Sequence, residues 1–301
     1  MSSAGKQMEV IYVPEPDLAF GHRQISDHPK DGLFLYGPHN GPARSKEISV
    51  GVIGTKEGLT YFRGWAIRLG GFISIPPKGK MDKEHRLHLS NFPGIEEAFG
   101  LMLSPGEFVE RTIDLDALDE ATRTVNQHEA VRKAVDLFVR EIERFDRNEE
   151  RRVDIWIFVL PEIVFERCKP LARRIGLELN PGEFAKSQRD KTDIPLFAGV
   201  IDQTDEEIFD DVPDFHRQVK ARLLRLGHTS QLVRETTLAP EAFLNRAGYP
   251  KRRLQEPASV AWNLSTGLYY KTQPEPPWKL AAVRPGVCYI GLVFKLIPND
   301  E

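Results

Sequence analysis

The feature that most constrains the fold is an amphipathic stretch followed closely by a continuous apolar run. Residues 126–145 place apolar side chains at helical spacing, which predicts a long helix with one buried face. Residues 153–160 read V-D-I-W-I-F-V-L, and so short and apolar a run predicts a strand that is covered on both faces. A helix leading into such a strand is typical of a βαβ unit. The sequence therefore predicts an α/β fold with a parallel sheet.

The rest of the chain alternates in the same way. We expect strands at 48–53, 72–75, 108–115 and 232–237, and helices from about 54 to 69 and at 214–226, 240–246 and 257–271. Together these segments predict a small central parallel sheet flanked by helices, with Rossmann-like topology. In open α/β sheets, ligands bind beyond the carboxyl ends of the strands. We therefore expect a binding site at that edge.

Composition narrows the functional classes. At 301 residues with 41% hydrophobic and 28% charged side chains, the chain is typical of a globular protein. It has no apolar run long enough for a membrane span, and its N-terminus lacks the apolar core of a signal peptide, so we expect a cytoplasmic protein. Cys168 and Cys288 show no metal-binding spacing. With a net charge of −3, nucleic-acid binding would require a local basic pocket.

One stretch carries candidate binding chemistry. His216 and Lys220 are four residues apart, so they project from one face of the helix expected at 214–226. Gln231 lies in the turn that we expect after this helix. A cation, a second nitrogen donor and an amide that converge in this way suit an anion with several oxygens, such as a terminal phosphate. The alternative is that these residues belong to an ordinary solvated helix face, which also carries Arg217 and Arg225.

A family resemblance extends this interpretation. The pattern His-x-x-x-Lys, with Gln-Leu-Val-Arg beginning eleven residues after the lysine, resembles the guide-end pocket of the Argonaute MID domain. Asn263 and Lys271, in N-L-S-T-G-L-Y-Y-K, match the later positions of that pocket, and P-W-K-L follows at 277–280. The run C-Y-I-G-L-V-F at 288–294 resembles the first strand of the PIWI domain. Segments 15–21 and 31–38 resemble the lead-in to MID in prokaryotic Argonautes.

The resemblance implies a domain plan and a ligand. It implies a β-rich N-terminal connector at 1–42, a Rossmann-like MID domain at 43–280, and the first strand of a truncated, RNase H-like PIWI domain at 281–301. The ligand would be a short 5′-phosphorylated guide strand that recognises a complementary target, with a divalent cation such as Mg²⁺ bridging the guide phosphates. The first base would stack on an aromatic side chain or on the His216 ring. The residues implied for the 5′-phosphate are His216, Lys220, Gln231, Asn263 and Lys271.

The same resemblance predicts that the chain does not cut nucleic acid. Val293, two residues after Gly291, stands where the family has its first catalytic aspartate, and an isopropyl group cannot bind a metal. We expect no PAZ region before the lead-in segments, and in this the chain resembles short prokaryotic Argonautes. This resemblance implies a separate effector subunit, either an NAD-consuming protein or a nuclease, in defence against foreign DNA. The sequence leaves open whether the guide is RNA or DNA. The alternative function is a Rossmann-like enzyme acting on a phosphorylated small molecule.

Overall fold

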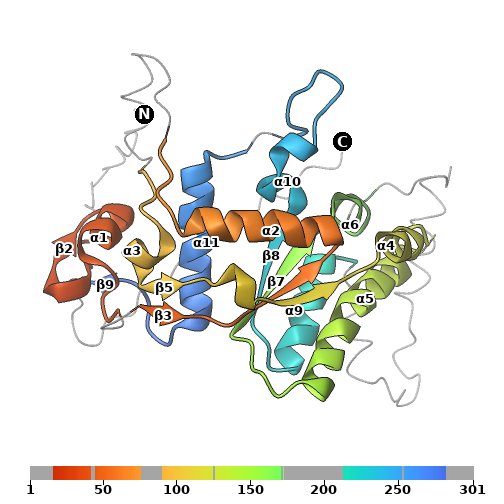
Figure 1. The fold of residues 1–301 in the computed structure, drawn as a ribbon, viewed down its shortest axis with the longest axis horizontal. Coiled ribbons are helices and arrows are strands. Elements are labelled where there is room, and N and C mark those ends of the chain that lie inside the picture. The colour runs from red at the N-terminus through yellow and green to blue at the C-terminus, as the bar shows by residue number, and fades with distance from the viewer. Residues whose placement is uncertain are drawn as a thin grey trace, which may run out of the picture.

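The computed structural model has a four-stranded parallel sheet at its centre (Figure 1). It describes residues 16–41, 45–75, 90–124, 126–170, 172, 213–252 and 254–282. The strand order is β6–β4–β7–β8, and every pairing in this sheet is parallel. The strands are β4 (Val50–Gly54), β6 (Val109–Thr112), β7 (Ile155–Leu160) and β8 (Ser230–Arg234). The predicted α/β class with a central parallel sheet flanked by helices is confirmed.

Helices cover both faces of this sheet, and alternate residues of β7 point to opposite sides. Ile155 and Ile157 pack into one cluster with side chains of α2 (Lys56–Leu69) and α11 (Pro257–Thr272). Trp156 and Phe158 pack into a second cluster with the helices of the other face. Those helices are α4 (Leu115–Thr122), α5 (Gln127–Asn148), α6 (Glu162–Arg167) and α9 (Phe215–Arg225). Coverage of both faces explains why β7 is apolar throughout.

Two local features explain where α5 begins and how Trp156 fits into the core. The Asn126 side chain accepts hydrogen bonds from the backbone N–H groups of His128 and Glu129, and so caps the N-terminus of α5. In β4, a Cβ atom on Gly51 would lie 2.4 Å from Cε3 of Trp156. Glycine at this position therefore gives the indole ring its space in the core.

The N-terminal part of the described chain forms a separate small sheet. Its order is β2–β1–β9, with both pairings antiparallel, so β1 (Leu18–Ala19) lies between β2 (Ile25–Ser26) and β9 (Lys279–Leu280). This sheet ties residues 18–26 to the segment after α11. Within the described part of the connector, residues 16–41, an eight-residue helix, α1 (Pro29–Tyr36), forms where short strands and turns were expected, so the β-rich prediction is wrong there.

Smaller elements complete the fold. A parallel pair, β3 (Lys46–Glu47) with β5 (Leu101–Met102), lies beside helix α3. The remaining short elements are α3 (Ile95–Phe99), α10 (Glu235–Leu238) and the 3-10 helices η1 (Gly21–Arg23), η3 (Pro105–Glu107) and η4 (Pro240–Ala242). None of the helices within the described ranges has both the length and the apolar character needed to cross a membrane.

Several predicted boundaries are wrong. The strand expected at 232–237 ends at Arg234, because its ladder partner β7 ends opposite Arg234 at Leu160. The residues that follow form the helix α10 instead. The strand expected at 72–75 is only an isolated bridge between Ile73 and Phe92. The helix expected at 240–246 is the three-residue η4. Gln231 lies inside β8 rather than in a turn.

Part of the expected domain plan lies outside the described residues. This applies to the PIWI-like strand at 288–294, with Gly291 and Val293, and to the start of the connector. The domain boundaries at 42 and 280 therefore stay predictions.

Candidate anion-binding site

The candidate site lies along β8, the edge strand of the sheet, between α9 and α11. Helix α9 begins at Phe215, where the side chain of Asp214 accepts from the backbone N–H of His216 at 2.9 Å. Phe215 and Val219 are buried against the sheet. His216 and Lys220 each follow one of these buried residues, so both project along the same flank of the helix.

Lys271, on α11, links this helix to the edge strand β8. Its Nζ donates to the carbonyl oxygen of Ser230 at 2.7 Å and to Oε1 of Gln231 at 2.6 Å. Gln231 Nε2 in turn donates to the carbonyl oxygen of Leu232 at 2.9 Å. The ammonium group is thus held beside β8 by neutral oxygen atoms only, within the described part of the chain.

The cationic groups act on one another. Burial lowers the pKa of His216, and the charge of Lys220 lowers it further, whereas Asp214 has the opposite effect. Lys271 and Arg217 also lower the pKa of His216. Burial lowers the pKa of Lys271 to about 8, with a further contribution from Lys220. The charge of Lys220 thus acts on both His216 and Lys271, and Lys271 contacts Gln231. We call these four residues the cation site.

In the ranges that the structure describes, no carboxylate forms an ion pair with a side chain of the cation site, and Asp214 acts on His216 only through its charge. There, the side chains of Lys220 and His216 make no ion pair or hydrogen bond, and Asp214 is 3.8 Å from Arg217. Half-buried like charges without a counterion raise the free energy of the unliganded protein. An anion bound between the two helices would relieve this repulsion.

Asn263 occupies a different position from the other predicted residues. It lies on α11 two turns before Lys271, about 12 Å by helical rise. Its Nδ2 donates to Oε1 of Gln255 at 3.0 Å. Asn263 and Gln231 line one open groove of ≈ 480 Å³, which we call the α11 groove. The structure thus connects Asn263 to the cation site through Gln231.

The sequence interpretation missed other residues of this region. Arg234 donates to both carboxylate oxygens of Glu162, at 2.6 and 2.8 Å, and its guanidinium carbon lies 3.3 Å from the centre of the Phe165 ring. Arg252 lines the α11 groove near this pair, and Arg234 forms part of the groove wall. Arg234 belongs to the Q-L-V-R motif and Arg252 to the basic run at 251–253, so both carried a signal in the sequence.

A second pocket adjoins the site on the α9 side. It measures ≈ 330 Å³, is lined by His216 and Phe165, and shares Leu232, Val233 and Arg234 with the α11 groove. The edge strand therefore has a pocket on each side, with imidazole and phenyl rings on the α9 side.

The donors of the cation site fit a metal ion poorly. Two of the four are ammonium groups, which repel a cation, and the described residues include no group of three or more metal-ligating His, Cys, Asp or Glu side chains. The site therefore offers its own positive charge where a Mg²⁺ ion was expected from the family resemblance.

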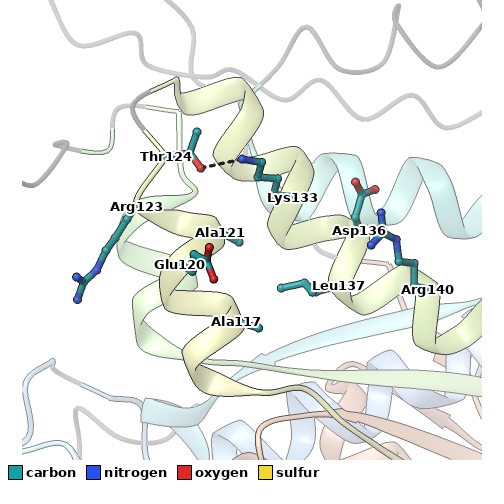
Figure 2. A pocket seen from close by; sticks show the side chains of 9 residues that line it. All are labelled: Ala117, Glu120, Ala121, Arg123, Thr124, Lys133, Asp136, Leu137 and Arg140. Atoms are coloured by element: carbon teal, nitrogen blue, oxygen red, sulfur yellow. Dashed lines mark hydrogen bonds between the residues drawn. The ribbon is translucent and has the colours of Figure 1, made fainter.

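A groove between α4 and α5 is a weaker candidate for an anion (Figure 2). Its rim carries Arg123, Lys133 and Arg140, but Glu120 and Asp136 line it as well. Lys133 Nζ is 2.9 Å from the carboxylate of Glu129 and donates to Oγ1 of Thr124 at 3.4 Å. Since carboxylates offset the cations here, this groove lacks the excess positive charge of the cation site.

Comparison with known proteins finds a likeness among solved structures alone, and it is a distant one. No family model matches the chain, and no curated protein matches its sequence. Among solved structures, an Argonaute from Clostridium butyricum, bound to a guide DNA and a 19-mer target DNA, aligns with a TM-score of 0.40 and 14% sequence identity. The alignment covers 90% of this chain and 25% of the neighbour, so the chain spans about a quarter of its length.

Proposed function

We propose that the chain anchors the 5′-phosphate of a short nucleic-acid guide strand at the cation site. The observation that carries this proposal is the half-buried Lys271, which is bonded to neutral oxygens, lies beside Lys220, and has a pKa lowered to about 8. A site under such electrostatic repulsion is suited to an anion that restores full charge to Lys271.

A terminal phosphate suits this site better than an internal one. A phosphate monoester carries close to two negative charges near neutral pH, because its second pKa is about 6. A phosphodiester inside a strand carries only one negative charge. Two lysines and an imidazole therefore favour the end of a strand over its middle. The open α11 groove supports a chain-like ligand, because Gln231 of the cation site is part of its lining, together with Asn263, Gln255 and Arg252.

The remaining parts of the proposal come from the family resemblance. The bound guide would pair with a complementary target in defence against foreign DNA. With Val293 at the position of the catalytic aspartate, cleavage or NAD consumption would belong to a separate effector subunit. Mg²⁺-dependent cleavage of a guide-matched target by the purified chain would contradict this part. Target-triggered activity in complexes isolated from the native host would support it.

The test of guide anchoring compares strands that differ only at the 5′ end. Labelled RNA and DNA oligonucleotides, each with either a 5′-phosphate or a 5′-hydroxyl, are titrated with the protein in a fluorescence anisotropy assay. We expect the phosphorylated strands to bind about 10- to 100-fold more tightly, the range for hydrogen bonds to a charged group. Lys220→Ala and Lys271→Ala should each remove most of this preference.

Two controls give the result its meaning. Arg140→Ala removes one positive charge outside the cation site, and it should leave the preference for a 5′-phosphate unchanged. Nucleoside 5′-monophosphates, added as competitors, test the alternative of a small-molecule enzyme. If they compete as strongly as phosphorylated strands, a site for phosphorylated small molecules becomes the better account. Equal binding of 5′-phosphate and 5′-hydroxyl strands would refute the proposed function.

A further inference from the structure

The α11 groove has the chemistry of a site for a planar, partly polar group. Its wall includes half-buried or buried apolar side chains, and its rim carries amides and guanidinium groups. The apolar residues of the groove are Leu232, Val233, Leu254, Val260 and Leu264. A flat heterocycle placed on this wall would remove apolar surface from water, while its edge stayed at the polar rim.

The amide pair at the rim presents one donor and one acceptor side by side. Asn263 uses its Nδ2 to donate to Oε1 of Gln255. This leaves Oδ1 of Asn263 and Nε2 of Gln255 without a partner among the described residues. An acceptor next to a donor is the arrangement with which paired amide groups read the edge of a nucleobase. Both side chains are exposed, so a ligand can reach them without rearrangement.

The charged groups of the groove favour a ligand with a backbone phosphate. Nη2 of Arg234 donates to both carboxylate oxygens of Glu162, so the charge of Arg234 is largely offset. Arg252 has no hydrogen bond or ion pair with any described residue. It is therefore available to a phosphodiester that lies at the mouth of the groove.

The two sides of β8 suit different parts of the ligand. The α9 side, with the His216 and Phe165 rings, adjoins the cation site and suits the first base by stacking. The α11 groove lies on the other side of the strand, and Asn263 is about 12 Å from Lys271 along the helix. A base in this groove therefore belongs to a nucleotide after the terminal one.

We propose that the α11 groove binds one nucleobase downstream of the 5′-terminal nucleotide, and that Gln255 and Asn263 read the edge of that base. This inference rests on the proposed anchoring of the 5′-phosphate at the cation site. It gives the protein a base preference at an internal position near the guide end.

The experiment varies the base at each of the first few positions of a 5′-phosphorylated strand and measures affinity by fluorescence anisotropy. We expect one position after the first to show a preference of at least about fivefold for one base over another. An abasic site at that position should lose affinity relative to every base, because stacking on the apolar wall is lost.

Two variants tie the preference to the amide pair. Gln255→Leu and Asn263→Leu should each reduce the base preference to within about twofold, while the abasic strand still binds less tightly. In Gln255→Leu, which lies outside the residues implied for the 5′-phosphate, the 5′-phosphate preference should be unchanged. Both side chains are exposed, and thermal unfolding verifies that each variant is folded. Gln255 lies outside α11, so its variant tests the idea even if Asn263→Leu disturbs the helix.

The outcomes separate this inference from the proposed function. A strong preference for the 5′-phosphate with no base preference beyond the terminal nucleotide overturns the base-reading groove alone. A base preference that survives both variants overturns it as well. Loss of the 5′-phosphate preference in the wild-type protein overturns the proposed function, and the base-reading groove with it.

Discussion

Neutralising Lys220 should weaken guide binding while leaving the fold intact or slightly more stable. Its charge lowers the pKa of both His216 and Lys271, and it has no ion pair or hydrogen bond with any described residue. Lys220→Met keeps the length of the apolar stem and removes only the ammonium group. The variant therefore removes a repulsion from the free protein and an attraction from the complex.

The two effects differ in size. Loss of one hydrogen bond to a charged phosphate costs about 1.5–3 kcal/mol, which corresponds to a loss in affinity of roughly 10- to 100-fold. Relief of repulsion between partly solvated charges is worth only about 0.2–1 kcal/mol, because solvent screens them. We therefore expect a large decrease in affinity for a 5′-phosphorylated strand, with a small increase in the free energy of unfolding.

Anisotropy titrations with 5′-phosphate and 5′-hydroxyl strands measure the first quantity, and urea denaturation without ligand measures the second. Arg140→Met is the matched control, because it removes one positive charge on α5, outside the cation site. Its affinity for both strands should stay within about twofold of wild type. The reasoning would be refuted if Lys220→Met weakened both strands equally, or if it lowered the free energy of unfolding by more than about 1 kcal/mol.

Three further predictions address the site and the core. Affinity for the 5′-phosphate should be full between about pH 7 and 8, where the phosphate monoester is doubly charged, and fall by up to about tenfold per pH unit above that range, because free Lys271, with a pKa of about 8, loses its proton there. Lys271→Arg should flatten the loss at high pH in the same titrations. Gly267→Ala should raise the free energy of unfolding by about 0.5–1 kcal/mol, because glycine inside a helix is less favourable than alanine. Binding should be preserved, since the new Cβ would meet Gln231 Oε1 at an ordinary 3.4 Å. A destabilised variant would contradict this. Gly51→Ala should lower that free energy by roughly 1–3 kcal/mol, because its Cβ would overlap Trp156; unchanged urea unfolding would show that the core yields more easily.

Local pattern predicted the centre of the fold well and its edges less well. The apolar periodicity of α5 and the continuous apolar run of β7 identified both elements, because burial on one face or two leaves a direct signature in the sequence. The end of β8 had no such signature. Thr236 and Thr237 favour a strand, but β7 offers no pairing partner beyond Leu160. The boundary depends on a neighbouring strand that is distant in the sequence.

The candidate site was predictable where spacing within one helix decides geometry. His216 and Lys220 share a flank because they are one turn apart. The contact of Lys271 with Gln231 joins residues that are forty positions apart, and only the family resemblance suggested it. Gln255 was missed because the segment before α11 has no periodic pattern. Its partnership with Asn263 depends on how that segment folds back against the helix.

The position of the site also differs from the general expectation for open α/β sheets. That expectation places a ligand beyond the carboxyl ends of the strands, but among the described residues several polar side chains at that edge are paired with one another. Glu235, only 6% exposed, accepts from Thr55 Oγ1 at 2.7 Å, and burial raises the pKa of its carboxyl group. The Arg234–Glu162 pair occupies the neighbouring position.

The cation site instead uses the free side of the edge strand. The unpaired backbone groups of an edge strand attract a further strand unless side chains cover them. In β8, the carbonyl oxygens of Ser230 and Leu232 accept from Lys271 and Gln231, respectively. Each of these side chains covers part of the edge and belongs to the cation site. Lys271 and Gln231 therefore both protect the edge and form part of the proposed anion site, and their hydrogen bonds to β8 hold them in place without a ligand.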